Sequence, residues 1–275
     1  VNSQSLYEAS LSFLPSISDP FPLQAWAWAA INPDTGLPAE YRELIKSSGA
    51  PRWILGMSKE LGRLFQGYKS IDGLHDTEGT QTCRFIHRKD MPADKKATYV
   101  RVVTMFREQK ADPYRIRMTV GGNLIEFPGD KSTKTADIIA IKALINSIIS
   151  TPGARAAAID LKNFYLENDL PNKEYIRIPV LYIPTDIQEQ YNLKEYIVDG
   201  HVYAEISKGM YGLPQAGKVA SDFLIPRLAA AGYHETGVIP GLFKHESNSV
   251  TFALVVDDFL IKYSDKKDLD HLKNT

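Results

Sequence analysis

The feature that most constrains the fold is an apolar, β-branched run from Val250 to Tyr263 that two aspartates, Asp257 and Asp258, interrupt. Apolar residues on both sides of a polar pair predict a β-hairpin packed on a core, with the carboxylates at its tip. Two anions crowded in a partly enclosed place favour a neutral form unless a cation balances them, and Mg²⁺ prefers carboxylate oxygens. An acidic surface turn would explain the pair equally well.

A third aspartate favours the metal interpretation. Asp160 ends a short apolar stretch, Ala156 to Ile159, which predicts a strand that continues into a turn or helix. Neighbouring strands lie about 4.8 Å apart, so Asp160 and Asp257 can face each other if their strands pair in one sheet. Two metal ions about 3.5–4 Å apart stabilise both the attacking and the leaving oxygen in a displacement at phosphorus. Taken alone, Asp160 would more often be a helix N-cap.

The segment Tyr114 to Val120 alternates strictly between apolar and polar residues, which predicts a strand with a basic face. Arg115 and Arg117 lie two residues apart, so their guanidinium groups project about 7 Å apart on the same side. This arrangement suits bidentate contacts with phosphate oxygens. The alternative is a solvated strand face beside a lysine-bearing turn.

Together these segments resemble the fingers and palm of the reverse transcriptase of LTR retrotransposons, in copia-like or gypsy-like Pol polyproteins, and through them retroviral reverse transcriptase. In that family an aromatic residue follows the first catalytic aspartate by five positions, as Tyr165 follows Asp160. The family's Asp-Asp pair follows an apolar residue, as in Val256-Asp257-Asp258, and its Leu-Pro-Gln segment matches Leu213-Pro214-Gln215. The similarity runs from about residue 80 to the C-terminus.

The resemblance implies two-metal nucleotidyl transfer with two Mg²⁺ ions, for which Mn²⁺ could substitute. Asp160 and Asp257 would bind both ions, and Asp258 would be a weaker ligand or would support the other two carboxylates. The backbone carbonyl of Leu161 would be a further ligand. Leu260 stands where the family usually places glycine, which adds a side chain near the site.

The resemblance also implies a nucleotide site. Arg117, with Arg115 beside it, occupies the place of the arginine that holds the incoming triphosphate, and Lys110 has the spacing of a second such contact. Tyr165 would stack under the deoxyribose and clash with a 2′-hydroxyl, which gives a preference for dNTPs. Gln215 would line the nucleotide pocket and contact the sugar or the template base.

The implied fold is α+β: a right-hand polymerase with fingers and palm, an antiparallel palm sheet with helices packed on one face, and no thumb, because the chain is expected to end before it. Residues 1–70 would be a helical and loop-rich extension. Residues 71–150 would be the fingers, with a hairpin at Thr98–Val120 and a helix at Thr133–Ile149. Residues 151–275 would be the palm with the catalytic aspartates.

Hydrophobic periodicity and turn residues predict further elements. In the helix at Thr133–Ile149, the isoleucines at 138, 141, 145 and 148 and the leucine at 144 are expected to be buried. Glu174–Pro179 and His201–Ser207 are predicted strands around an insertion. The other predictions are helices at Phe21–Ala30, Arg52–Gln66 and Pro214–Gly232, strands at Arg84–His87 and Thr98–Arg107, an insertion at Asp186–Asp199, and the start of a helix at Asp265–Leu272.

Composition narrows the class of protein. The chain of 275 residues has a net charge of −1, which is unexpected for a nucleic-acid-binding enzyme, so local basic clusters at His87–Lys96 and Lys110–Arg117 would have to carry that binding. Cys83 is the one cysteine, which excludes an internal disulfide and a cysteine-based zinc cluster. No run of eighteen apolar residues is present, so no membrane partner is expected.

The expected partners are an RNA or DNA template with its primer, dNTPs, and the remainder of Pol, namely the thumb, RNase H and integrase. The expected location is a cytoplasmic retrotransposon particle, or the nucleus. One alternative is a decayed or domesticated fragment that binds nucleic acid or protein without catalysis. Another is a metal-dependent nuclease, which would not need Arg117, Tyr165 and Gln215 in this order.

Overall fold

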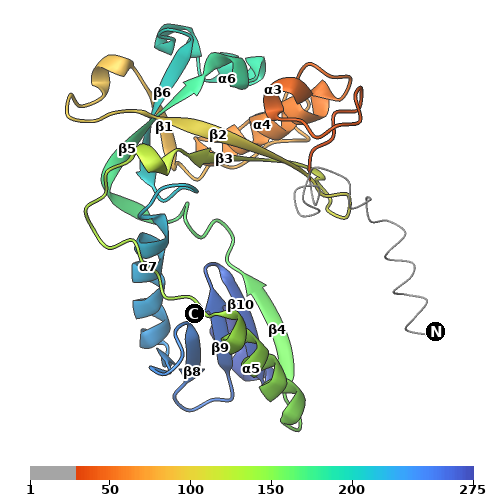
Figure 1. The fold of residues 1–275 in the computed structure, drawn as a ribbon, viewed down its shortest axis with the longest axis vertical. Coiled ribbons are helices and arrows are strands. Elements are labelled where there is room, and N and C mark those ends of the chain that lie inside the picture. The colour runs from red at the N-terminus through yellow and green to blue at the C-terminus, as the bar shows by residue number, and fades with distance from the viewer. Residues whose placement is uncertain (1–28) are drawn as a thin grey trace, which may run out of the picture.

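The computed structural model describes residues 29–275, and the chain in this range is α+β. Its strands form two five-stranded sheets that lie one above the other in Figure 1. The strand order is β1-β6-β5-β2-β3 in the first sheet and β4-β10-β9-β8-β7 in the second. No helix of the described residues is both long and apolar enough to cross a membrane.

The first sheet is antiparallel except where β2 runs parallel to β5. Its strands are β1 (Cys83–Ile86), β2 (Thr98–Phe106), β3 (Tyr114–Val120), β5 (Asp169–Pro179) and β6 (His201–Lys208). All five lie at or within a few residues of the predicted strands. The hairpin of β2 and β3 pairs Val100 with Val120 and Phe106 with Tyr114, so the strict alternation predicted for β3 is confirmed.

Helix α4 (Ala50–Leu64) covers the edge strand β3, close to the predicted helix at Arg52–Gln66. Apolar residues recur at helical spacing on its inner face, where Trp53, Met57 and Leu61 are at most 2% exposed. Gly56 allows the close approach, because a Cβ there would lie 2.9 Å from the carbonyl oxygen of Tyr114. The helix therefore belongs to the core of the first sheet.

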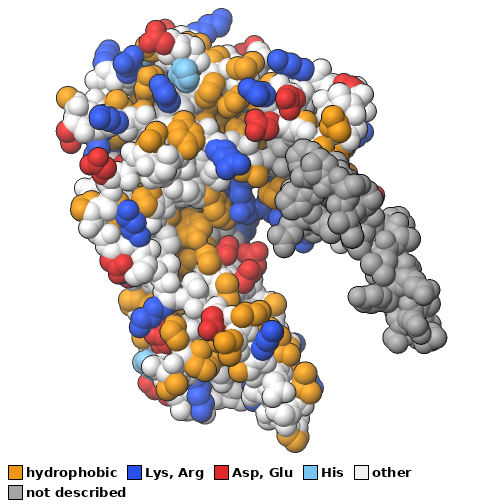
Figure 2. All heavy atoms as spheres, in the orientation of Figure 1, with side chains coloured by type: hydrophobic (Ala, Val, Ile, Leu, Met, Phe, Trp, Pro, Cys, Tyr) orange, Lys and Arg blue, Asp and Glu red, His pale blue; other side chains and the backbone are white. Residues whose placement is uncertain are grey.

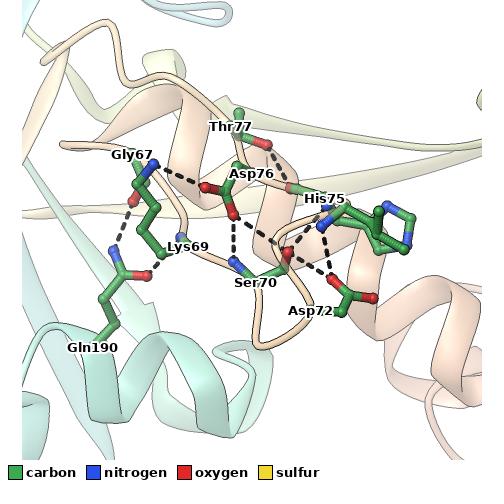
Figure 3. A network of polar contacts seen from close by, with 9 residues as sticks. Gly67, Lys69, Ser70, Asp72, His75, Asp76, Thr77 and Gln190 are labelled. Carbon is green, nitrogen blue, oxygen red and sulfur yellow. Dashed lines mark hydrogen bonds and ion pairs between the residues drawn. The ribbon is translucent and has the colours of Figure 1, made fainter.

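A polar network holds the loop between α4 and β1 (Figure 3). Asp76 accepts hydrogen bonds from the backbone N–H of Ser70 and from the Lys69 ammonium, at 2.9 and 2.8 Å. The side-chain amide of Gln190, at the end of α6 (Thr185–Gln190), donates to the carbonyl of Gly67 at 2.9 Å. The loop is thus fixed to the same core as α4.

The segment 186–199, predicted as an insertion, is part of this core. Ile187 of α6 and Leu193 in the turn that follows are at most 1% exposed. The hydroxyls of Ser58 and Tyr68 both donate to the carboxylate of Asp186, at 3.0 and 2.5 Å. Because the segment supplies buried apolar residues, it packs as a structural element rather than projecting as an added loop.

The second sheet is antiparallel throughout and contains the predicted hairpin. Strands β9 (Thr251–Val255) and β10 (Asp258–Tyr263) form the hairpin, and β4 (Arg155–Asp160) pairs with β10. The remaining strands and helices of this part are β7 (Tyr233–Glu235), β8 (Leu242–His245), α5 (Ile138–Ser150), α7 (Ala216–Ala230) and α8 (Lys266–Lys273). The short helix α3 (Tyr41–Leu44) lies on the first sheet instead.

Helices pack on both faces of the second sheet, so the prediction of helices on one face is wrong. Phe252 and Leu254 of β9 pack in a cluster with residues of α7 and α8. The alternate residue Ala253 packs with residues of α5. The reason is visible in the sequence of β9, which is a continuous apolar run, as is typical of a strand buried on both faces.

Helix α5 begins five residues later than predicted. The backbone N–H of Ala136 donates to the carbonyl of Leu254, which ties this residue to β9, and the Asp137 carboxylate then caps the helix through the N–H of Ala140. The face of α5 that packs on the sheet carries Ala140 and Leu144, so Leu144 is buried as predicted, but the predicted core residues 138 and 145 are 64% and 43% exposed.

The chain passes between the two sheets more often than the predicted division allows. Strands β5 and β6, expected with the catalytic hairpin, belong to the first sheet, and α5, expected with the first sheet, packs on the second. Residues 29–70 contain α4, which shares the core of the first sheet. The predicted helix at Phe21–Ala30 lies outside the described residues as far as Trp28, and Ala29 forms a β-bridge with Met105.

Candidate active-site cavity

A cavity of about 600 Å³ lies between the two sheets. In Figure 2, basic side chains gather above an open hollow and acidic side chains lie below it. Four cations come from β3 and α4, and two aspartates come from the end of β4 and the tip of the β9–β10 hairpin. Arg115, Arg117, Lys59 and Arg63 line one side together with Glu60 and Asp112, and Asp160 and Asp257 line the other together with Lys162.

The acidic side is built by strand pairing. Asp160 is the last residue of β4 and lies opposite Asp258, the first residue of β10. Asp257 precedes it in the hairpin loop, and its carbonyl accepts a hydrogen bond from the N–H of Leu161 at 2.9 Å. Asp160, Leu161 and Asp257 line the cavity, whereas Asp258 does not. The structure therefore brings together two of the three predicted carboxylates and the predicted carbonyl ligand.

The hairpin tip carries backbone strain. The loop between Val255 and Asp258 has two residues, and Val256 has a φ of +60°. Two-residue loops match the twist of a hairpin when φ is positive at the first position, where glycine is usual. A β-branched residue in this region is an outlier, and such strain persists where the surrounding structure imposes it, often at functional sites. The strain lies immediately before Asp257.

The acidic groups perturb one another. The pKa of Asp257 is raised above its ordinary value of 3.8, first by partial burial and then by the charges of Asp258 and Asp160. The charge of Arg117 across the cavity acts in the opposite direction. The carboxylates are therefore crowded anions for which a bound cation would be favourable.

The basic side follows from the alternation of β3. Ile116 and Met118 are at most 3% exposed, which places Arg115 and Arg117 on the other face. The Nε of Arg117 is buried and has no hydrogen-bond partner in residues 29–275, and its guanidinium lies 4.2 Å from the ring centre of Tyr211. The pKa of Arg115 is lowered by burial and by the nearby charge of Arg117. This wall presents the guanidinium groups of Arg115 and Arg117 to the cavity.

Helix α4 adds charged groups that sequence reasoning missed. Lys59 pairs with Asp112 at 2.8 Å, and Arg63 forms a close ion pair with the buried Glu60. Arg63 also donates to the side-chain carbonyl of Asn163, just after Asp160 in the chain, at 3.3 Å. The available signal was the spacing of Lys59 and Arg63, which places two cations four residues apart on one helix face.

Three residues of the predicted nucleotide site do not line the cavity. Lys110 is exposed in the turn between β2 and β3 and does not line the cavity. Gln215 is 2% exposed at the start of α7, where its amide donates to Glu174 at 3.2 Å instead of facing the cavity. Tyr165 is half-buried next to the cavity, with its ring edge-on to Tyr211 at 5.1 Å between centroids. Burial and the charge of Asp257 raise the pKa of Tyr165.

The cavity contains oxygen donors of the kind that bind hard metal ions. Within residues 29–275 no group of three or more His, Cys, Asp or Glu side chains is arranged to hold a metal. Asp160 and Asp257 carry hard oxygen donors, and Leu161, whose carbonyl is the predicted third donor, lines the same cavity. Mg²⁺ is commonly bound by one or two carboxylates together with substrate phosphates, so this set suits Mg²⁺ in the presence of a phosphate ligand.

A comparison of the chain with models of known protein families found no match.

Proposed function

We propose that this chain is the fingers and palm of an RNA-directed DNA polymerase, a reverse transcriptase of a retrotransposon Pol polyprotein. One observation carries the proposal: Asp160 and Asp257, 97 positions apart in the sequence, line one cavity together with Arg115 and Arg117. Two crowded carboxylates are suited to a metal ion, and the two cations opposite them are suited to phosphate oxygens. The charges of the cavity are therefore complementary to those of a metal-bound triphosphate.

The residues of the cavity have separate tasks in this proposal. Asp160, Asp257 and the Leu161 carbonyl would hold Mg²⁺, which supplies neutralisation of the triphosphate and a lower pKa of the primer 3′-hydroxyl. Arg117 and Arg115 bind phosphate oxygens and orient the nucleotide, because phosphoryl transfer depends mainly on positioning and charge. Tyr165, beside the cavity, stacks under the sugar and excludes a 2′-hydroxyl.

The partners in this proposal are dNTPs, an RNA or DNA template with its primer, and the remaining parts of Pol. The proposed location is a cytoplasmic particle or the nucleus. A polymerase fold of the fingers and palm type is part of the proposal, with the β9–β10 hairpin as the catalytic hairpin and the β2–β3 hairpin as the nucleotide-binding one.

A second candidate is a non-catalytic descendant that binds nucleic acid or protein. The observation that favours it is the position of Gln215, whose amide is buried against Glu174 rather than facing the nucleotide. The carbonyl oxygen of this side chain has no hydrogen-bond partner in the described part of the chain.

The test is Mg²⁺-dependent incorporation of dTTP on poly(rA)·oligo(dT) by the chain and by three variants. Asp257→Asn should reduce the rate about 10³-fold or more, since the lost charge stabilisation is worth several kcal/mol. Arg117→Met should lower kcat/KM about 10- to 100-fold, as expected for lost charge-assisted hydrogen bonds. The control Arg155→Met, at the far end of β4, should change kcat/KM less than about twofold.

The alternatives predict other outcomes. A folded wild-type chain that binds template but incorporates no nucleotide in Mg²⁺ or Mn²⁺ contradicts the polymerase proposal and favours the non-catalytic candidate. Cleavage of the template that requires Asp257 but not Arg117 would indicate a nuclease.

A further inference from the structure

Tyr211 lies in the segment between β6 and α7, and neighbours on both sides hold this segment in place. Met210 is fully buried and Leu213 is 5% exposed, both in the core of the first sheet. Tyr211 itself is only partly buried and lines the cavity. The buried neighbours therefore act as anchors, and the ring is presented to the cavity.

The backbone of this segment is docked on the end of β3. The N–H of Val120 donates to the carbonyl of Tyr211 at 2.8 Å. Gly212 has a φ of +93°, and a Cβ there would lie 2.2 Å from the carbonyl oxygen of Val120. Glycine is required for this approach. The position of Tyr211 relative to β3, and so to Arg117, is fixed by the backbone.

The ring of Tyr211 contacts two other side chains of the site. The guanidinium of Arg117 lies 4.2 Å from its centre, within the range of a cation–π interaction. The ring of Tyr165 meets it at 5.1 Å and 89°, an edge-to-face arrangement. The Nε of Arg117 has no hydrogen-bond partner in residues 29–275, so packing against the ring contributes to the orientation of this guanidinium.

We infer that Tyr211 is a positioning residue that couples two features of substrate binding: the placement of the triphosphate through Arg117 and the selection of the sugar through Tyr165. The inference rests on the proposed function, because it assigns those roles to Arg117 and Tyr165. Both contacts are made by the ring and not by the hydroxyl. An aromatic replacement should therefore preserve the effect, and an aliphatic one should remove it.

The experiment compares Tyr211→Phe and Tyr211→Leu with the wild-type chain by calorimetric titration. Inorganic tripolyphosphate without metal reports on Arg117, and the ratio of dATP to ATP affinity in Mg²⁺ reports on the sugar. Tyr211→Leu should weaken tripolyphosphate binding about fivefold to thirtyfold, the range of a partly desolvated cation–π contact, and should reduce the dATP preference. Tyr211→Phe should stay within about threefold of wild type in both titrations.

Steady-state kinetics distinguish a loss of positioning from a general loss of stability. In an active enzyme, Tyr211→Leu should raise KM for the nucleotide more than it lowers kcat, because ground-state placement is lost. Thermal unfolding of each variant shows whether it is folded. If Tyr211→Leu is folded and binds both ligands as the wild type does, or if Tyr211→Phe is as defective as Tyr211→Leu, the inference is overturned.

The two proposals can fail separately. If the wild-type chain incorporates no nucleotide, the polymerase function fails, while the tripolyphosphate and nucleotide titrations still decide whether Tyr211 couples the two contacts. If the wild type is active and Tyr211→Leu keeps both its affinity and its sugar preference, the coupling fails and the polymerase function stands.

Discussion

The two sides of the cavity are constructed differently. The basic side belongs to two regular elements: the strand β3, in which each charged residue alternates with a buried one, and the helix α4. The acidic side is made from chain ends and a turn: Asp160 at the end of β4, and Asp257 in a two-residue loop after the strained Val256. The cations project from the regular, hydrogen-bonded backbone of secondary structure. The positions of the carboxylates depend instead on pairing between strands that are distant in sequence and on an unfavourable backbone conformation.

The cores behind the two sides differ as well. The first sheet rests on one large cluster that includes α4 and the buried Trp53, with a small second cluster of Ile86, Tyr175 and Tyr203. The second sheet is divided into two smaller clusters, one toward α7 and α8 and the other toward α5. We therefore expect the acidic side to be destabilised more easily by substitution than the basic side.

The largest effect is expected in the core of the second sheet. Phe252 is fully buried and stacks on Phe243 with 5.1 Å between ring centres. Phe252→Ala should lower the free energy of unfolding by about 3–5 kcal/mol, measured by urea denaturation followed by circular dichroism. Phe223→Ala, at a position that is 59% exposed, is the matched control and should cost less than about 1 kcal/mol. Equal losses would contradict a separate core in this sheet.

An intermediate effect is expected where the segment of Tyr211 meets β3. Gly212→Ala combines a positive φ with a contact of 2.2 Å to the backbone of Val120, and it should cost about 2–4 kcal/mol of unfolding free energy. Gly36→Ala has a φ of +70° but no atom within 4 Å of its Cβ, so it measures the conformational strain alone at about 1 kcal/mol. A cost at Gly212 no larger than at Gly36 would show that the close approach is not rigid.

The smallest effect is a change in pH dependence on the acidic side. The pKa of Asp257 is higher in the folded chain than its ordinary 3.8, so the folded state binds more protons and stability falls as pH rises above 3.8 through the raised pKa. Without divalent cations, Asp257→Asn should therefore melt higher than wild type at pH 7, and the difference should shrink toward pH 4. Partial exposure keeps the effect small.

Asp268 supplies the control of opposite sign. Hydrogen bonds from the hydroxyl and the backbone N–H of Ser249 lower the pKa of Asp268, so its contribution to stability is present above 3.8 and is lost as pH falls through the lowered pKa. Asp268→Asn should melt lower than wild type at pH 7. Calorimetric scans of both variants at pH 4 and pH 7 test the two directions, and a higher melting temperature for Asp268→Asn at pH 7 would contradict this assignment.

Local patterns predicted the elements well. In β3 and in the hairpin around Asp257, the local sequence decides on which face of the strand each side chain lies. Both elements were therefore predictable without knowledge of the rest of the fold. What the patterns could not provide was the partner of each strand. The continuous apolar run of β9 predicted burial but not that helices cover both of its faces, because such a run is compatible with any apolar neighbour on either side.

The same limit applies to the cavity. Asp160, Asp257 and Arg117 were predictable as candidates from spacing and residue type, and the structure places all three at one cavity. Gln215 was not placed correctly by its motif, because its direction depends on Glu174, a residue of β5. The role of Tyr211 depends on a glycine that approaches β3 closely, and no periodicity reveals this contact.

The order of the strands also has a consequence for how the chain folds. Asp160 and Asp258 face each other across the β4–β10 pair, yet β5 and β6, which lie between them in sequence, belong to the first sheet. Pairing of strands that are so far apart in sequence has an entropic cost of loop closure, and such non-local pairing is typical of slow folding. We expect the acidic side to form late in folding, once β9 and β10 have been synthesised, so that a partly made chain has the cations of the cavity in place before the carboxylates that face them.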